Sequence, residues 1–295
     1  MRRVRTAATR DVVSLDGRLV PAARATVSVY DRGFLYGDAV FETVRAYGGR
    51  LFLWPLHARR LAASLRTFGI SPPRVDLPHA ALSVLAARGL AEAAVRVTVS
   101  RGTGEGLVAP HGLQPTVVVT AREIPSELPE QRRRGVAVVV LPFGRGHGSV
   151  TDGHKTNAYL PAVLGKTRAA ARGAFEGLYV ERDGTVSEGT TSNVFAVRDG
   201  RLLTPPLDAG CLPGVTRQTV LRLAQQAGLE CVSTAIAATE LLEMDELFLT
   251  ASTIEVLPIV RIGRRRVGNG TPGPTTRLLQ ERYRAFVERT LARAR

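Results

Sequence analysis

The chain has 295 residues, 44% of them hydrophobic and 22% charged, which is typical of a globular protein large enough for one large or two ordinary domains. No apolar run reaches the length of a membrane span, and the basic stretch Met1–Thr6 leads into no apolar segment, so we expect neither a membrane protein nor a signal peptide. Cys211 and Cys231 are too few and too isolated for a disulfide framework or a zinc site, and we expect a cytoplasmic protein without a metal.

The formal net charge of +14 raises the question of nucleic-acid binding. Arginines are scattered along the whole chain, with short runs only at Arg132–Arg134 and Arg264–Arg266. Neither run is interleaved with aromatic residues, and no nucleic-acid-binding motif accompanies them. We therefore expect a solvated arginine-rich surface and no nucleic-acid partner.

Only two of the 40 basic residues are lysines, Lys155 and Lys166. An arginine guanidinium stays protonated at ordinary pH and forms no Schiff base. A desolvated lysine amine, in contrast, can lose its proton and can form a Schiff base. Because this chain uses arginine for its other positive charges, both lysines are candidates for covalent or acid–base chemistry. The alternative is that one or both occur by coincidence.

The first part of the chain alternates between predicted strands and helices. Asp16-Gly17 and Gly48-Gly49 are turn signals that each join two strands into a hairpin, and a shaped loop over 28–38 lies between the two hairpins. The predicted strands are Val12–Leu15, Arg18–Val20, Val40–Tyr47, Arg50–Leu53, Ala94–Ser100 and Thr116–Thr120, and the predicted helices are Trp54–Phe68 and Leu77–Arg88.

The segment 124–134 is charged and contains proline, so we predict a linker there between domains 1–123 and 135–295. No regular βαβ repeat follows and no GxGxxG motif opens a helix, which favours an α+β fold and excludes a Rossmann cofactor site. The predicted strands of the second domain are Val136–Leu141, Gly177–Arg182, Thr185–Ser187, Val194–Arg198, Arg201–Thr204 and Glu246–Thr250, and the predicted helices are Tyr159–Arg172, Thr216–Ala227 and Thr275–Ala294.

Three further segments place polar residues where chemistry is possible. Glu188 follows a hairpin strand, where it either faces solvent or points inward at a cofactor. Thr216 opens a helix after Leu212-Pro-Gly-Val215, where free backbone N–H groups bind anions, although ordinary helix capping explains this stretch equally well. Arg60 lies on a predicted helix, where an arginine is usually solvated.

In order and spacing, these segments resemble the class IV aminotransferases, which are fold-type IV pyridoxal-phosphate enzymes. The motifs that carry the resemblance are Asp31-Arg-Gly-Phe34, Gly37-Asp-Ala-Val-Phe-Glu42, His57-Ala-Arg-Arg60-Leu61, Lys155, Glu188-Gly-Thr-Thr-Ser-Asn193-Val-Phe195, Thr204-Pro-Pro206, Leu212-Pro-Gly-Val-Thr216-Arg217 and Phe248-Leu-Thr-Ala-Ser-Thr253. The resemblance implies a two-domain α+β enzyme with a smaller N-terminal α/β domain and a larger C-terminal pseudo-barrel domain that binds pyridoxal 5'-phosphate. It also implies a homodimer with each active site at the domain and subunit boundary.

The resemblance assigns a role to each candidate residue. Lys155 would hold the cofactor as a Schiff base and then move a proton between the substrate α-carbon and the cofactor. Glu188 would pair with the pyridine nitrogen, and Lys166 then falls to a surface or packing role. The other implied cofactor contacts are Arg60, Val215, Thr216 and Ser252 at the phosphate and Tyr159 at the phenolic oxygen.

The substrate residues distinguish the reactions of this family. The D-amino-acid enzymes resemble one another in a tyrosine at the Phe41 position and an Arg-x-His clamp, neither of which this chain has. Tyr36, Phe41 and the turn Gly104–Gly106 look more like the branched-chain type, whose aromatic wall accepts an aliphatic side chain. The implied substrate contacts are Tyr36, Phe41, Arg96 and Thr253, with either Arg96 or Arg101 reaching the second carboxylate of glutamate.

We therefore predict transamination between an L-branched-chain amino acid and a 2-oxo acid, with glutamate and 2-oxoglutarate as the partner pair. The main alternative is 4-amino-4-deoxychorismate lyase, because Ser100–Gly104 and Phe41–Thr43 also occur in that branch. D-amino-acid and R-selective amine aminotransferases are further alternatives. A catalytically silent binding protein is disfavoured, because Lys155, Glu188 and Arg60 are all present.

Overall fold

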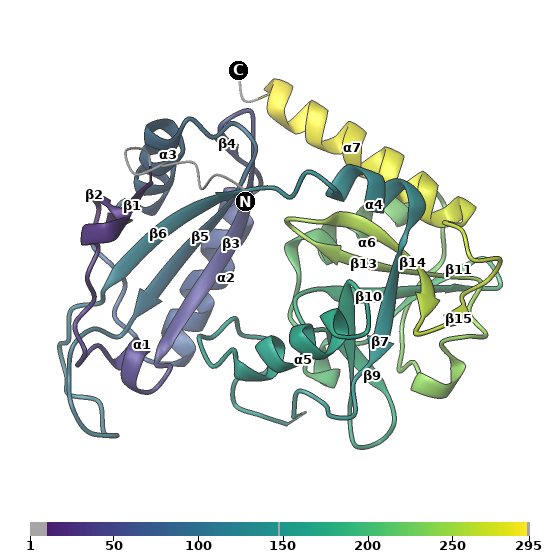
Figure 1. Ribbon diagram of the computed structural model, residues 1–295, viewed down its shortest axis with the longest axis horizontal. Coiled ribbons are helices and arrows are strands. Elements are labelled where there is room, and N and C mark those ends of the chain that lie inside the picture. The colour runs from purple at the N-terminus through teal and green to yellow at the C-terminus, as the bar shows by residue number, and fades with distance from the viewer. Residues whose placement is uncertain (1–10, 147, 294–295) are drawn as a thin grey trace, which may run out of the picture. The chain divides into compact units, whose positions relative to one another are not determined.

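The computed structural model describes residues 11–146 and 148–293, and the chain divides into two compact units (Figure 1). The first unit comprises Met1–Ile124 together with Lys155–Ala158, and the second comprises Pro125–His154 and Tyr159–Arg295. The basic stretch Met1–Thr6 lies outside the described residues. Among the helices of the described residues, none is both long enough and apolar enough to cross a membrane.

This division differs from the predicted domains in two places. The segment 124–134, predicted as a linker, contains helix α4 (Leu128–Arg134), which belongs to the second unit. Pro129 is tolerated there because it lies in the first turn of the helix, and Leu128 is buried. The second difference is that Lys155–Ala158 belong to the first unit although the chain on either side belongs to the second.

A six-stranded sheet with the order β2-β1-β6-β5-β3-β4 forms the first unit, and its strands pair antiparallel. Its strands are β1 (Val12–Leu15), β2 (Arg18–Pro21), β3 (Ala39–Tyr47), β4 (Arg50–Leu51), β5 (Ala93–Ser100) and β6 (Val117–Glu123), and its helices are α1 (Arg32–Leu35), α2 (Trp54–Thr67) and α3 (Leu77–Arg88). The predicted strands and the two longer helices lie where the sequence placed them, within a few residues at their ends.

The core of the first unit lies where α2 and α3 pack against one face of the sheet. Alternate residues of β5 and β6, such as Val95, Val97 and Val119, point into this core because successive side chains of a strand face opposite ways. Val40 of β3 belongs to the same core. Glu42 therefore points to the helix side of β3, and Phe41 points to the other face.

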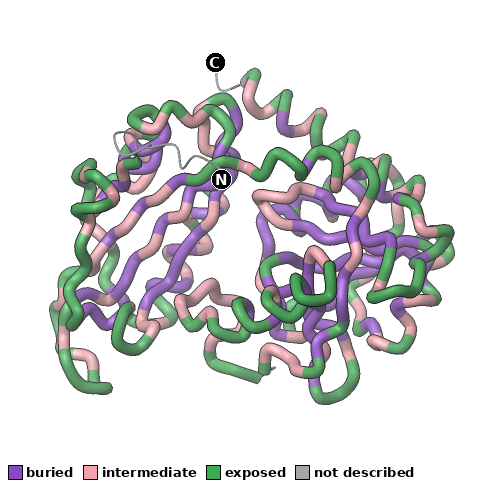
Figure 2. The backbone as a smooth tube through the Cα atoms, in the orientation of Figure 1, coloured by how far each residue is buried: buried purple, intermediate pink, exposed green. Residues whose placement is uncertain are grey.

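The second unit contains a nine-stranded mixed sheet with the order β12-β11-β10-β13-β14-β7-β8-β9, to which β15 adds beside β14. Although β9 ends this order, it also contacts β10, so the sheet curls back on itself. Its strands are β7 (Val136–Val140), β8 (Glu176–Val180), β9 (Val186–Gly189), β10 (Asn193–Arg198), β11 (Arg201–Thr204), β12 (Cys231–Ser233), β13 (Glu246–Ala251), β14 (Glu255–Ile262) and β15 (Arg265–Arg266), and its other helices are α5 (Leu160–Ala170), α6 (Val215–Gln226) and α7 (Pro274–Arg293). Figure 2 shows buried residues running along the strands of each sheet, and the α+β prediction is confirmed.

Strand β14 was not among the predicted strands, and Pro258 lies in its middle. A proline cannot donate a backbone hydrogen bond and is rare in a central strand. Here Pro258 pairs with Phe248 of β13, and the pairing of β14 with β7 is irregular between Ile259 and Arg261. The strand therefore contains a proline in regular register with β13, followed directly by the irregular stretch of its pairing with β7.

A substitution at Gly102 tests how tightly the loop after β5 is packed. Its φ is +97°, and a Cβ atom there would lie 1.9 Å from the backbone oxygen of Gln114. We expect Gly102→Ala to lower the free energy of unfolding by at least about 2 kcal/mol, from the left-handed backbone and the overlap together. Gly49→Ala is the matched control: its φ is +74°, but apart from its two chain neighbours no described residue has an atom within 4 Å of the added Cβ. Equal losses for the two variants in urea unfolding would contradict the packing argument.

Candidate functional site

Lys155 is held in place by backbone pairing with β3. The N–H of Phe41 donates to the carbonyl oxygen of Lys155 at 2.8 Å, and the N–H of Asn157 donates to the oxygen of Ala39 at 2.9 Å. Between them, Thr156 forms an isolated antiparallel bridge with Val40. These bonds involve only main-chain atoms, so the position of Lys155 does not depend on which side chain it carries.

The ring of Phe41 brings three of the predicted residues together. Phe41 is buried, and Lys155 Nζ lies 4.7 Å from the centre of its ring. The guanidinium carbon of Arg96 lies 3.4 Å from the same centre, a cation–π contact. Arg96 also donates from Nη2 to Asn157 Oδ1 at 3.0 Å and from Nε to Thr98 Oγ1 at 3.1 Å. The amine of Lys155 and the guanidinium of Arg96 thus both lie over one aromatic ring.

Arg60 is oriented by Glu42, a residue that the sequence analysis did not assign a role. Arg60 donates from Nε to Glu42 Oε1 at 2.7 Å and from Nη2 to Glu42 Oε2 at 2.8 Å. His57 Nδ1 lies 2.7 Å from the same carboxylate. Burial alone would raise the pKa of Glu42, but Arg60 and His57 outweigh it and lower that pKa to about 2.

The Arg101 guanidinium binds within the first unit. It donates to both oxygens of Asp38, at 2.7 and 3.0 Å, and to the backbone oxygens of Phe68 and Gly69. Arg32 Nε donates to the same carboxylate at 2.9 Å. Burial raises the pKa of Asp38, but its bonds to Arg101 and Arg32 outweigh burial, and the net pKa is lowered. Arg101 therefore tethers the start of β3 to the end of α2.

In the second unit, Glu188 accepts hydrogen bonds from several directions. Its Oε2 accepts from the backbone N–H of Leu212 at 2.9 Å and lies 3.5 Å from Asn193 Nδ2. Its Oε1 forms an ion pair with Arg145 Nη1. The Glu188 carboxylate near the end of β9 is therefore buried and oriented. Of the two possibilities given by the sequence, a side chain facing solvent or one pointing inward, the structure has the second.

Arg145 was missed by the sequence analysis, because it lies in a loop after β7 with no recognisable motif. Burial lowers its pKa, but the charge and hydrogen bond of Glu188 outweigh burial, and Asp152 and Tyr159 add to the net rise. Its Nη2 also donates to the oxygen of His154 at 3.1 Å. Tyr159, the residue that precedes α5, is thus near the Arg145–Glu188 pair.

The start of α6 has the features of an anion site. No side chain within the described part of the chain caps this 12-residue helix, which begins at Val215. The hydroxyl of Thr216 is buried and has no hydrogen-bond partner among residues 11–146 and 148–293. A buried hydroxyl without a partner costs free energy, so its presence beside free helical N–H groups points to a bound acceptor.

Gly214 links this helix to the surroundings of Glu188. A Cβ atom on Gly214 would lie 2.0 Å from Asn193 Oδ1, and Asn193 Nδ2 donates to the oxygen of Leu212 at 2.8 Å. Ser252 and Thr253 are partly buried in the turn after β13, and β13 contacts α6.

Tyr36, the remaining predicted substrate residue, lies at the end of α1 in the first unit, where its ring is exposed beside Arg32.

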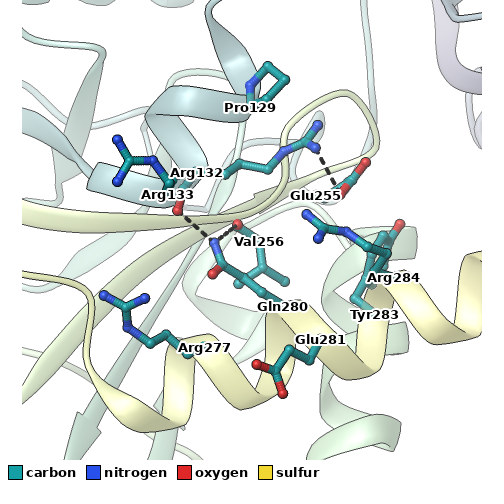
Figure 3. A pocket seen from close by; sticks show the side chains of 10 residues that line it. All are labelled: Pro129, Arg132, Arg133, Glu255, Val256, Arg277, Gln280, Glu281, Tyr283 and Arg284. Carbon is teal, nitrogen blue, oxygen red and sulfur yellow. Dashed lines mark hydrogen bonds and ion pairs between the residues drawn. The ribbon is translucent and has the colours of Figure 1, made fainter.

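A separate cavity of about 300 Å³ lies between α4, β14 and α7 of the second unit (Figure 3). Of its lining residues, Arg132 pairs with Glu255 at 3.2 Å, and the amide of Gln280 donates to the backbone oxygens of Arg132 and Val256, each at 3.0 Å. None of the predicted site residues lines this cavity. We therefore assign it no part in the chemistry of Lys155.

Comparison with known proteins gives one consistent family. The family "Amino-transferase class IV" matches residues 39–262 of this chain. A putative branched-chain-amino-acid aminotransferase from Methanocaldococcus jannaschii is 35% identical over 92% of this chain and 95% of its own length. A D-alanine aminotransferase from Bacillus licheniformis is 33% identical over 91% of this chain and 94% of its own.

Among solved structures, the branched-chain aminotransferase of the archaeon Thermoproteus uzoniensis with norvaline superposes with a TM-score of 0.85 at 32% identity, covering 94% of each chain. The PLP-bound form of a hypothetical aminotransferase from Mycobacterium tuberculosis gives a TM-score of 0.81 at 28% identity, covering 94% of this chain and 98% of its own. The similarity therefore extends over nearly the whole fold.

The ion pair of Glu42 predicts a pH dependence of stability. Because the folded-state pKa of about 2 is below the ordinary value of 4.5, the ionised Glu42 stabilises the fold above pH 4.5, and this contribution is lost as the pH falls from 4.5 toward 2. We expect Glu42→Gln to lower the free energy of unfolding at pH 7 by roughly 3 kcal/mol, because it leaves the Arg60 charge unpaired. The difference from wild type should shrink between pH 4.5 and 2.

Urea unfolding at several pH values measures this difference. Glu130→Gln is the control, because Glu130 is a fully exposed partner of Arg133 and should show a much smaller effect. A wild-type advantage over Glu42→Gln that does not change with pH would contradict the role of the charge.

Proposed function

This chain belongs to the class IV aminotransferase family, and from that premise we propose that Lys155 is the catalytic residue of its pyridoxal-phosphate-dependent transamination. The substrates we propose are L-branched-chain amino acids and their 2-oxo acids, with glutamate and 2-oxoglutarate as the partner pair. The observation that carries the proposal is the placement of Lys155, one of two lysines in the chain, on the buried ring of Phe41 beside Arg96.

When bound, pyridoxal 5'-phosphate supplies an aldehyde that reacts with amines and a ring that takes up the electron pair of the substrate α-carbon. Lys155 Nζ would hold the cofactor covalently and, once displaced by the substrate amine, act as the base for the α-proton. The ring of Phe41 lies beside Nζ, with the guanidinium of Arg96 over the same ring, so these two groups line the surroundings of the amine.

The residues of the second unit fit the polar ends of this cofactor. The Thr216 hydroxyl, which has no hydrogen-bond partner in the described part of the chain, and the first N–H groups of α6 suit a phosphate ester. We propose Val215, Thr216 and Ser252 as its ligands. Arg60 is the proposed cationic ligand, with its guanidinium already oriented by Glu42.

Glu188 is the proposed partner of the ring nitrogen. Arg145, Asn193 and the N–H of Leu212 hold its carboxylate in one orientation, which suits an acceptor of the hydrogen bond from a protonated ring nitrogen. Tyr159, near the same ion pair, is the proposed donor to the phenolic oxygen.

The geometry favours Arg96 over Arg101 for the second carboxylate of glutamate. Arg101 is held by the charge of Asp38 and by two backbone oxygens. Arg96 donates to the neutral side chains of Thr98 and Asn157, and its guanidinium lies over Phe41, the ring that Lys155 also contacts. The aromatic surface of Phe41 suits an aliphatic side chain equally well. We propose that Tyr36 and Thr253 complete the substrate contacts.

We also propose that the protein works as a homodimer. Its first unit exposes large apolar side chains on two segments, Phe34 on α1 and Leu107 and Val108 in the loop after β5. Arg32 of α1 donates to the backbone oxygens of Gly106 and Leu107, which holds these two segments together as one apolar patch. Exposed apolar patches of this kind are typical of subunit contacts. A cytoplasmic location stays a prediction.

Replacing Lys155 should abolish amino transfer without unfolding the chain. We expect Lys155→Ala to reduce the rate of L-leucine conversion with 2-oxoglutarate by at least roughly 1000-fold, because both the covalent anchor and the base are lost. Lys155→Arg is the matched control: it keeps the charge over Phe41 but has no reactive amine, and it should be equally inactive.

The same activity assay on the wild-type protein also distinguishes transamination of L-amino acids from the alternative reactions. Turnover of D-alanine but not of L-leucine would contradict the proposed stereopreference. Release of pyruvate from 4-amino-4-deoxychorismate without amino transfer would instead establish the lyase.

Replacing Arg96 should change the choice of substrate. We expect Arg96→Leu to reduce kcat/KM for glutamate roughly 10- to 100-fold relative to leucine, because one charge-assisted contact is lost only for glutamate. Arg101→Leu should lower the melting temperature but leave the glutamate-to-leucine ratio unchanged. The opposite pattern would assign the glutamate contact to Arg101.

A further inference from the structure

The second unit contains a fully buried carboxylate, Glu176 of β8, that the proposed chemistry does not use. Three consecutive hydroxyls donate to it: Thr190 to Oε1, Thr191 to Oε2 at 2.9 Å and Ser192 to Oε2 at 3.2 Å. Lys166 Nζ lies 3.3 Å from Oε2. A buried carboxylate with this many donors is held rigidly and is costly to disturb.

The three residues that carry these hydroxyls form the turn between β9, which contains Glu188, and β10, which begins at Asn193. Thr190 N–H also donates to the oxygen of Gly177 at 3.0 Å, so the turn is bound to β8 through both main chain and side chains. A Cβ atom on Gly189 would lie 2.4 Å from Ser192 Oγ, which shows how closely the turn is packed.

Lys166 connects helix α5 to the same cluster. Its Nζ donates to the oxygen of Phe175 at 2.7 Å and lies 4.5 Å from the centre of the Phe175 ring. The helix itself touches the turn, because a Cβ atom on Gly165 would lie 2.4 Å from Thr190 Cγ2. A compact ammonium fits between a carbonyl, a carboxylate and a ring face, whereas a guanidinium presents its donors in one larger plane. This accounts for a second lysine in a chain otherwise charged by arginine.

We propose that Glu176 and Lys166 are positioning residues for Glu188: they clamp the turn at 189–192 and thereby fix the carboxylate that precedes it and the amide of Asn193 that follows it. The clamp acts through the backbone, because Glu188 is adjacent to Gly189 and Asn193 is adjacent to Ser192. The catalytic consequence rests on the proposed role of Glu188 at the cofactor, whereas the clamp itself does not.

The test compares Glu176→Gln with Glu246→Gln. Glu246 is another buried carboxylate of the second unit, and it accepts hydrogen bonds from the N–H groups of Thr275 and Thr276 at the start of α7. Glu246→Gln therefore disturbs a carboxylate that is also buried but lies at a different place, away from the turn at 189–192. Two properties are measured: amide hydrogen exchange of residues 186–195 in the cofactor-free protein, and the dissociation constant of pyridoxal 5'-phosphate.

We expect Glu176→Gln to speed exchange in residues 188–193 and to raise the cofactor dissociation constant, each roughly 10-fold. Glu246→Gln should lower the melting temperature to a similar degree and change neither property. Lys166→Met and Thr191→Ala, which remove one donor each, should show the same two changes with smaller size, and they decide the matter if Glu176→Gln does not fold.

Equal effects of Glu176→Gln and Glu246→Gln on cofactor affinity would overturn the positioning role, as would faster exchange with unchanged affinity. If the wild-type protein bound no pyridoxal 5'-phosphate, the proposed function would fail. The exchange experiment would then still judge the clamp, because unchanged exchange in Glu176→Gln would overturn it.

Discussion

The pairing of residues 155–157 with strand β3 is the constraint on which the account of this protein depends. Two main-chain hydrogen bonds, from Phe41 to Lys155 and from Asn157 to Ala39, place a short segment against the first sheet although its neighbours in sequence belong to the second unit. The pairing needs no particular side chain at 155. The position is therefore available for a reactive amine, whose surroundings are then determined by Phe41 and Arg96.

Buried ion pairs orient the groups around this segment. Glu42 holds Arg60, Asp38 holds Arg101, and Arg145 holds Glu188, in each case with a carboxylate and a guanidinium that are at least partly shielded from water. Buried pairs contribute little net stability, because desolvation offsets their attraction, but they fix orientation. Arg60, Arg101 and Arg145 are only three of the 38 arginines, so the high net positive charge of the chain comes mostly from arginines outside these three ion pairs.

Periodicity and turn signals predicted most of the elements, because an amphipathic strand or helix is determined by neighbours within a few residues. The same reasoning missed β14, which has Pro258 in its middle, and assigned α4 to a linker because of its charge and its proline. Arg145 lies 43 residues from Glu188 in sequence and Glu42 lies 18 from Arg60, so no local pattern connects either pair. The resemblance identified Lys155, Phe41 and Arg96, but their contact through one ring required the three-dimensional structure.

The most direct test of the central claim uses the scarcity of lysine. Borohydride reduction of the protein loaded with pyridoxal 5'-phosphate makes the covalent bond permanent, and peptide mapping by mass spectrometry then identifies the labelled residue. With only two lysines in the chain, the assignment is unambiguous. We predict stoichiometric label on Lys155 and none on Lys166. Label on Lys166, or an unlabelled Lys155 in a protein that binds the cofactor, would contradict the account.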